Sequence, residues 1–279
     1  MYLQPKTLAE ACAALAVQPM RLLAGGTDVF PALGERQLAG PVLDLAGIGG
    51  MAGVSQTPDA FRFGACTTWS AVARAALPRG FRALQQAARE VGSLQIQNAG
   101  TIAGNLCNAS PAADGVPPLL ALDAEVEIAS AAGTRRLPLA DFITGYRKTA
   151  LLPDELVSAV LVPRDLAEAG SAFLKLGARK YLVISIAMIA AVLKVADERI
   201  VAARVAVGAC SPVALRLPGL EAALIGLPAR PGLETAIAAE HLAGLTPIDD
   251  VRASAAYRLD AVRTLIGRTL DAALEHAHG

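Results

Sequence analysis

Two runs of small and polar residues interrupt a chain that is otherwise aliphatic. The longer run covers residues 98–114 and combines glycines with the short donors and acceptors of Thr, Asn, Ser and Asp. The shorter run, residues 22–29, passes from two leucines through a glycine pair into Thr and Asp. Glycines let a backbone approach a ligand closely, and a glycine-rich turn can offer its amides to a phosphate. These runs, called the first motif (22–29) and the second motif (98–114), together predict one shared polar ligand.

A purely structural interpretation is available for each motif. Taken alone, the first motif is typical of a plain turn with a helix cap. The second motif is harder to explain as an ordinary connection, because it has no charged residue before Asp114 although the chain around it is hydrophobic. The pair of motifs therefore favours ligand binding.

A third glycine-rich run, residues 47–52, matches the G-x-G-x-x-A pattern of dinucleotide-binding proteins and follows an apolar strand. The pattern requires a helix directly after the glycines. Residues 53–58 are poor helix formers and end in Pro58, so we interpret the run as a connection between strands. The chain also lacks the G-K-[ST] sequence of a phosphate-binding loop, which disfavours a phosphotransferase.

The sequence lacks the combinations of side chains that nucleophilic catalysis and metal binding require. The three histidines, His241, His276 and His278, are distant in sequence from both motifs, so a Ser or Cys nucleophile has no general base beside it. Cys107 lies inside the second motif, and we interpret it as a small buried thiol. The four cysteines form no C-x-x-C pair. The sequence therefore predicts no catalytic residue and no metal site in this chain.

Composition narrows the functional class further. The chain has 279 residues, 54% of them hydrophobic, and 25 basic residues balance 25 acidic ones. Such a chain is expected to fold around large cores, and it has no basic run of the kind that binds nucleic acid. The first residues lack a signal-peptide pattern, and the longest apolar stretch, 182–193, is too short to span a membrane. We therefore expect a cytoplasmic protein.

Hydrophobic periodicity and turn residues predict an irregular alternation of helices and strands, an α+β fold. A capping box at Thr7 begins a helix that runs to Val17. The second motif is expected to be a loop after a helix at 81–91. The strands expected in this part are 21–24, 42–45, 60–64, 124–130 with a turn at 132–133, and 156–162.

Residues 164–170 are polar, follow Pro163 and end in a glycine, so we predict a domain boundary there. Beyond it, 186–195 and 200–209 are expected to form a hairpin. Three helical stretches should follow, the last from about 250 to 277. A sheet covered by helices is the expected second unit.

A basic segment follows this boundary, with Lys175, Arg179 and Lys180 close to Tyr181. Its cations could serve an anionic cofactor, or they could be solvated charges at the end of a strand. Tyr181 could stack on a ring, although a tyrosine at the edge of the core is the ordinary interpretation.

At these segments the sequence resembles the FAD-binding medium subunit of the molybdenum hydroxylases, the family of xanthine dehydrogenase and aerobic carbon monoxide dehydrogenase. The resemblance implies a two-part FAD-binding domain of the vanillyl-alcohol-oxidase type at 1–164, with subdomains of about 1–55 and 56–164. A C-terminal α+β domain of the carbon monoxide dehydrogenase flavoprotein type would cover 171–279. The segments that carry the resemblance are LLAGGTDV at 22–29, TIAGNLCNASPAAD at 101–114, FLKLGARKYLVISIAM at 173–188 and DDVRASAAYR at 249–258.

The resemblance also implies the residues that would hold FAD. The first motif would bind the pyrophosphate, the second would complete the grip on phosphate and ribityl chain, and Lys175 would lie near the flavin. Ala103 departs from the glycine common in the family, and the chain lacks the cysteine-rich insertion of the 4-hydroxybenzoyl-CoA reductase branch. The implied cofactor-binding residues are Leu22, Leu23, Ala24, Gly25, Gly26, Thr27, Asp28, Val29, Thr101, Gly104, Asn105, Asn108, Ser110, Asp114 and Lys175.

The function implied is electron transfer within an oxidoreductase complex. An iron–sulfur small subunit with [2Fe-2S] clusters and a large subunit with the molybdenum cofactor would be the partners, assembled as a dimer of heterotrimers. FAD in this chain would pass electrons from the iron–sulfur clusters to an acceptor such as NAD or a quinone. Two alternatives stay open: a free-standing FAD oxidoreductase, and a flavin-binding accessory protein without turnover.

Overall fold

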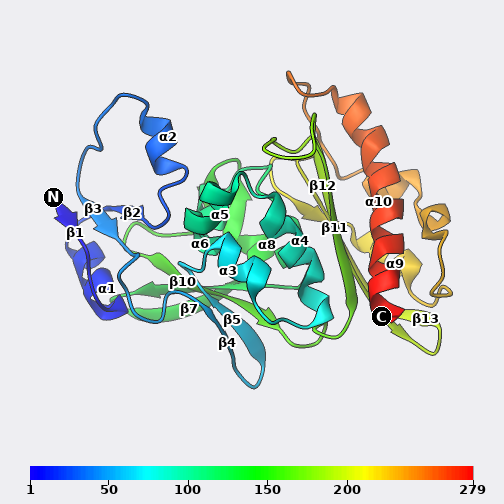
Figure 1. Ribbon diagram of the computed structural model, residues 1–279, viewed down its shortest axis with the longest axis horizontal. Helices are drawn as coiled ribbons and strands as arrows, with labels where there is room; N and C mark the ends of the chain where they lie inside the picture. Colours follow the sequence, from blue (N-terminus) through cyan, green and yellow to red (C-terminus); the bar gives the residue numbers. More distant parts are fainter. Residues whose placement is uncertain (279) are drawn as a thin grey trace.

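The computed structural model describes residues 1–278, and its N-terminal part is a small parallel sheet with a helix beside it (Figure 1). The Thr7 hydroxyl accepts a hydrogen bond from the Glu10 amide at 3.2 Å and so caps the first helix, as the capping pattern predicts. The sheet has the order β1-β3-β2 with both pairs parallel. Its elements are β1 (Tyr2–Leu3), α1 (Leu8–Val17), β2 (Arg21–Leu23), α2 (Val29–Leu33) and β3 (Val42–Asp44).

A five-stranded antiparallel sheet follows, with the order β4-β5-β10-β6-β7. The strands expected near 60–64, 124–130 and 156–162 are confirmed. Residues 47–52 connect β3 to β4 without a helix, so this run is no dinucleotide-binding turn. The strands are β4 (Val54–Gln56), β5 (Ala60–Gly64), β6 (Glu125–Ser130), β7 (Gly133–Pro138) and β10 (Leu156–Pro163), with a separate hairpin of β8 (Ile143–Gly145) and β9 (Lys148–Thr149).

Short helices lie beside this sheet, and two of them correct the expectation that the second motif is a loop. Ser93 caps α5, where its hydroxyl accepts from the Ile96 amide at 3.3 Å, and Thr101 caps α6 in the same way from Gly104 at 3.1 Å. The glycines and asparagines obscured these two capping signals. The helical elements are α3 (Trp69–Arg74), η1 (Arg79–Phe81), α4 (Arg82–Glu90), α5 (Leu94–Ala99), α6 (Ile102–Asn108), α7 (Val116–Ala121) and α8 (Leu139–Phe142).

The C-terminal part is a four-stranded antiparallel sheet with the order β11-β12-β13-β14. The predicted hairpin is confirmed, and β12 pairs with β13 from Met188 to Arg199. The last helix begins at Ala255 rather than near 250, because the Asp249 carboxylate accepts from the Ala255 amide at 2.7 Å and the residues before it form turns. The elements are β11 (Gly170–Leu176), β12 (Ala187–Ala196), β13 (Arg199–Gly208), β14 (Leu215–Arg216), α9 (Pro218–Leu224), η2 (Leu233–Ala236), η3 (Ala239–Leu242) and α10 (Ala255–His278).

Strand β12 joins the two parts of the molecule because its two faces belong to different cores. Met188, Ala190 and Val192 pack into the larger core with α4 and α7, whereas Ile189 and Leu193 pack into the smaller core under α10. This alternation is the period of two expected for a strand with both faces buried. In Figure 1 α10 lies on one side of this sheet and α4 on the other.

The connection from β10 to β11 is a turn segment, 164–169, but it is not a free linker. Leu166, Ala167 and Ala169 are buried, and the Gly80 amide donates to the Ala167 carbonyl at 2.7 Å. A Cβ at Gly80 would lie 2.1 Å from the Leu166 carbonyl oxygen, so only glycine fits this approach. Polar composition alone could not reveal this packing.

Within residues 1–278, no helix is both long enough and apolar enough to cross a membrane. The same residues contain no group of three or more His, Cys, Asp or Glu side chains placed to hold a metal ion.

Candidate functional site

The two motifs meet at one place in the fold. The turn of the first motif abuts the joint between α5 and α6, where a Cβ at Gly25 would lie 1.9 Å from the carbonyl oxygen of Ala99. A Cβ at Gly100 would lie 3.3 Å from the Thr27 hydroxyl. Glycine at both positions therefore permits a direct approach of two backbone segments that are about 75 residues apart in sequence.

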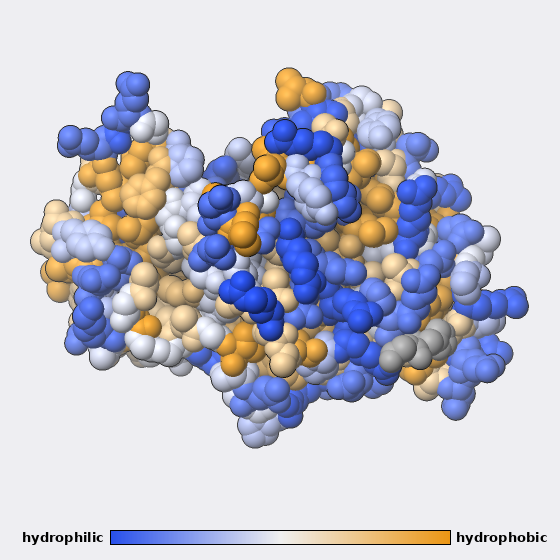
Figure 2. All heavy atoms as spheres, viewed as in Figure 1, coloured by the Kyte–Doolittle hydropathy of each residue, from blue (hydrophilic) through white to orange (hydrophobic). Residues whose placement is uncertain are grey.

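A cleft of about 420 Å³, called the first cleft, opens along this contact. Its size is in the range of small-molecule sites. Figure 2 shows the surface hollowed between α2 and the central helices. Eleven of the fifteen predicted site residues line it: Leu22, Ala24, Gly25, Gly26, Thr27, Asp28, Val29, Thr101, Gly104, Asn105 and Asn108.

Four predicted site residues lie elsewhere. Leu23 is buried in the N-terminal sheet, one residue from the cleft wall. Ser110 lines a different cleft of about 520 Å³, called the second cleft, which lies where the two parts of the molecule meet. Asp114 and Lys175 line neither cleft and form a buried pair.

Unpaired polar groups in the first cleft fit FAD. In the part of the chain that the structure describes, the amides of Gly25, Gly26 and Thr27 donate to no protein acceptor, as an anion-binding turn requires. The side-chain oxygen of Asn105 is buried and accepts no hydrogen bond from the described residues. A buried acceptor without a partner is costly, and the hydroxyls of a ribityl chain are suitable donors for it.

A chain of side-chain contacts borders the first cleft. The Asn108 amide donates to the Asp28 carboxylate at 2.9 Å, and its carbonyl oxygen accepts from the Arg147 guanidinium. Asp28 comes from the first motif, Asn108 from α6, and Arg147 from the turn between β8 and β9. Three distant segments are thereby fixed at one border of the cleft.

Lys175 and Asp114 form a buried ion pair that joins the two parts of the molecule. The Lys175 ammonium lies 2.8 Å from the Asp114 carboxylate and also donates to the Glu90 carbonyl at 3.3 Å. The Ser185 hydroxyl donates to the other carboxylate oxygen at 2.9 Å. Burial raises the pKa of Asp114, and the ammonium opposes this shift. Contact of either residue with a cofactor stays a prediction.

Sequence reasoning missed the apolar wall of the first cleft. Trp69, Ile96 and Leu151 line it, but nothing in their sequence context distinguishes them from other core residues. Cys107 also lines the cleft and is exposed there, contrary to the expected buried thiol, because α6 presents it to the opening. Desolvation raises the pKa of Cys107 to about 12, so the thiol stays protonated at neutral pH.

The remaining candidates lie away from the first cleft. Tyr181 is 61% exposed in the loop after β11, with the Lys180 ammonium over its ring at 5.6 Å. The Arg179 guanidinium donates to the Leu182 carbonyl at 3.0 Å. His241 and His276 bond to backbone atoms, and the side chain of His278 lies outside the described part.

Comparison with known proteins identifies the class that this geometry suggests. Residues 1–165 match the family described as FAD binding domain in molybdopterin dehydrogenase, and residues 172–273 match the CO dehydrogenase flavoprotein C-terminal domain. Fold and site together therefore define a two-domain FAD-binding oxidoreductase component.

The chain belongs to the FAD-binding family of the molybdopterin dehydrogenases. This membership confirms the resemblance seen in the sequence, the two-domain α+β fold and the cofactor, FAD.

Individual relatives agree with the family assignment. The nicotinate dehydrogenase FAD-subunit of Eubacterium barkeri is 37% identical over 193 residues, which cover 66% of this chain and 65% of that subunit. A putative xanthine dehydrogenase FAD-binding subunit of Escherichia coli K12 is 31% identical over 283 residues, covering 100% and 97% of the two chains. The solved structure of carbon monoxide dehydrogenase from Hydrogenophaga pseudoflava superposes with a TM-score of 0.90 at 28% identity, covering 99% of this chain and 97% of that one.

Proposed function

We propose that this chain is the FAD-binding electron-transfer subunit of a molybdenum-containing hydroxylase or dehydrogenase. In this function, electrons arrive from the iron–sulfur clusters of a partner subunit and leave through FAD to an acceptor such as NAD or a quinone. The observation that carries the proposal is the first cleft, where both motifs converge and the turn amides of the first motif have no acceptor among residues 1–278.

Different residues of the first cleft are suited to different parts of the cofactor. The amides of Gly25, Gly26 and Thr27 are suited to the pyrophosphate, because they are donors on a turn that closely approaches α5 and α6. The Asn105 side chain is suited to the ribityl hydroxyls. Bound FAD supplies the exchange between one-electron and two-electron transfer, so the chain needs no acid–base pair of its own.

The domain division and the partners complete the proposal. We place the FAD-binding domain at 1–164, with subdomains of about 1–55 and 56–164, and the C-terminal domain at 171–279. The partners would be a [2Fe-2S] small subunit and a molybdenum-binding large subunit in a dimer of heterotrimers. The cytoplasmic location stays a prediction from the sequence.

The first experiment is to purify the full chain, incubate it with FAD and remove the excess. The absorbance near 450 nm and the FAD released by acid then give the stoichiometry. Approximately one FAD per chain is expected, and a chain without FAD after reconstitution would contradict the proposal.

Addition of the reduced iron–sulfur subunit should next bleach the flavin absorbance. Bleaching by a small alcohol or amine without any partner would instead favour the free-standing oxidoreductase. Flavin that accepts no electrons from the reduced iron–sulfur subunit would favour an accessory protein.

A further inference from the structure

The connection between β2 and β3 is a long exposed segment that contains α2, and we call residues 28–40 of it the flap. The two strands are parallel neighbours, so the connection must run back along the sheet, and a helix in such a connection normally packs on the sheet. Here no residue of the flap is buried, those of α2 included. Figure 1 shows α2 standing away from the strands beside it. The flap therefore lacks the buried contacts that usually fix a crossover connection.

Open space lies on both sides of the flap. On one side Asp28 and Val29 line the first cleft. On the other side a hollow of about 380 Å³ lies between the flap and Arg21 of β2. The guanidinium groups of Arg21 and Arg36 both line this hollow, so collapse of the flap onto the sheet would bring like charges together. These charges favour movement of the flap toward the first cleft.

One hydrogen bond joins the flap to a distant part of the chain. Within residues 1–278, the Asn108 amide is the one group outside residues 26–40 that bonds to the flap, and it donates to the Asp28 carboxylate at 2.9 Å. Asn108 is itself held by the guanidinium of Arg147. Other polar contacts of the flap are internal, such as the Arg36 guanidinium donating to the Ala32 carbonyl at 2.9 Å. The bond between Asp28 and Asn108 is thus suited to be a latch.

Glycines give the flap backbone freedom at both ends. Gly26 and Gly40 flank it with φ of 69° and 82°, in the region that glycine adopts without strain. The Phe30 ring lies so close to Gly26 that a Cβ there would clash with it, yet 54% of Phe30 is exposed. An aromatic ring that is half in water gains free energy when a ligand or a closing segment covers it. The ring therefore lies directly beside the free amides of the first motif and is still partly uncovered.

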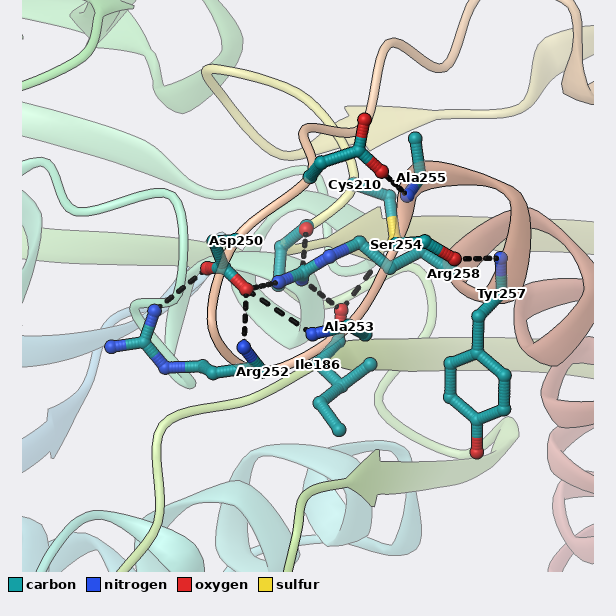
Figure 3. A network of polar contacts seen from close by, with 11 residues as sticks. Ile186, Cys210, Asp250, Arg252, Ala253, Ser254, Ala255, Tyr257 and Arg258 are labelled. Atoms are coloured by element: carbon teal, nitrogen blue, oxygen red, sulfur yellow. Dashed lines mark hydrogen bonds and ion pairs between the residues drawn. The ribbon is translucent and has the colours of Figure 1, made fainter.

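The segment before α10 is also on the surface, and it shows what firm anchoring requires. The Asp250 carboxylate accepts from the guanidinium groups of Arg252 and Arg258 at 2.7 and 2.8 Å (Figure 3). Arg258 is only 3% exposed, and it donates to the carbonyls of Ile186 and Ala209 at 2.5 and 3.1 Å. Those bonds reach from the surface into the core. Among the described residues, the flap has no bond of this kind.

We propose that the flap closes over FAD in the first cleft, with the Phe30 ring covering the diphosphate and the bond between Asp28 and Asn108 as the latch. This inference rests on the proposed function. The free amides of the first motif hold a diphosphate more tightly when water is excluded, because charge interactions strengthen in a medium of low polarity. Closure also buries the exposed part of Phe30. The flap thereby sets how slowly FAD leaves the chain.

Trypsin tests the closure directly, because Arg36 is the one Lys or Arg between Arg21 and Arg62. The full chain without FAD should be cut after Arg36 about tenfold faster than the chain loaded with FAD, since proteolysis follows the population of an open segment. Asn105→Ala, which is expected not to bind FAD, should gain no protection from it. Hydrogen exchange supplies the reference: FAD should slow exchange of the flap amides far more than exchange in the exposed turn 194–199.

Phe30→Ala measures what the covering ring contributes. FAD dissociation, followed by flavin fluorescence after dilution, should become about tenfold faster, while the association rate constant changes less than about twofold. The matched control is Ile225→Ala, which truncates a side chain that is 48% exposed and lies outside the first cleft, and it should leave both rates unchanged.

The outcomes separate the flap from the proposed function. A chain that carries about one FAD but is cut after Arg36 equally fast with and without it would overturn the flap alone. Unchanged dissociation in Phe30→Ala, or the same acceleration in Ile225→Ala, would do so as well. A chain that binds no FAD would contradict the proposed function and the flap together.

Discussion

The two clefts of this molecule are built in opposite ways. In the first cleft Asp28 is the one charged residue among the described lining residues, and most of the polar lining comes from two compact motifs. In the second cleft four charged residues gather from segments as distant as 147 and 258. Backbone amides and glycines recognise phosphate by shape, and contiguous sequence can supply them. Recognition by charged side chains needs groups that only folding brings together.

The largest expected effect is the loss of FAD binding in the first cleft, caused by Gly25→Val. A Cβ there would lie 1.9 Å from the Ala99 carbonyl oxygen, so the two motifs must separate and the amides lose their common geometry. We expect FAD affinity to fall about 1,000-fold or more, measured by calorimetry and by flavin absorbance. The control is Gly49→Val, at a glycine with no heavy atom within 4 Å of the added Cβ. Full flavin absorbance in Gly25→Val and in Asn105→Ala would exclude the assigned cofactor site.

The next largest effect is expected on stability, from the buried ion pair of Lys175 and Asp114. Lys175→Met leaves the Asp114 carboxylate buried without its cation, and we expect a loss of about 3–5 kcal/mol in the free energy of unfolding. Urea denaturation measures this loss. The control is Arg204→Met, which breaks a half-exposed pair with Asp123 and should cost less than about 1 kcal/mol. Similar losses in both variants would mean that the buried pair has no special structural role.

A smaller and pH-dependent effect is expected at Asp250 in the second cleft. Hydrogen bonds, the strongest from the Arg252 amide, lower the pKa of Asp250 below its ordinary value of 3.8. The ionised Asp250 carboxylate therefore stabilises the fold fully above pH 4, and this stabilisation is lost as the pH falls further. Asp250→Asn should cost about 2 kcal/mol at pH 7, and the difference from wild type should shrink below pH 4 in chemical denaturation. A difference independent of pH would show that charge is not the cause.

The smallest effect is expected at a helix cap of the first cleft. Thr101→Ala removes the hydroxyl that accepts from the Gly104 amide at 3.1 Å. We expect a loss of about 1 kcal/mol in unfolding free energy, with Thr101→Ser close to wild type. Thermal denaturation of the two variants measures this loss of stability. If Thr101→Ser were as destabilised as Thr101→Ala, methyl packing rather than the cap would be responsible.

Much of the fold could be predicted because its signals are local. The cap at Thr7, the alternation in β12 and the hairpin turn before Arg199 depend on residues a few positions apart. The helices of the second motif were missed because its glycines and asparagines outweighed the capping hydroxyls of Ser93 and Thr101. The apolar wall of the first cleft has no local signal, since any buried aliphatic side chain looks the same in sequence.

The sequence by itself determined the α+β class, the family and eleven residues of the first cleft, because contiguous glycines and short polar side chains both define the family and form the turn and helix ends. Only the tertiary structure decided that Asp114 pairs with Lys175 and that Arg147, Arg252 and Arg258 share one cleft. The physical reason is the distance along the chain over which each property is set. Backbone geometry follows from neighbours along the chain, whereas the charge at a point in space is a sum over residues that only the packing of the two domains brings together.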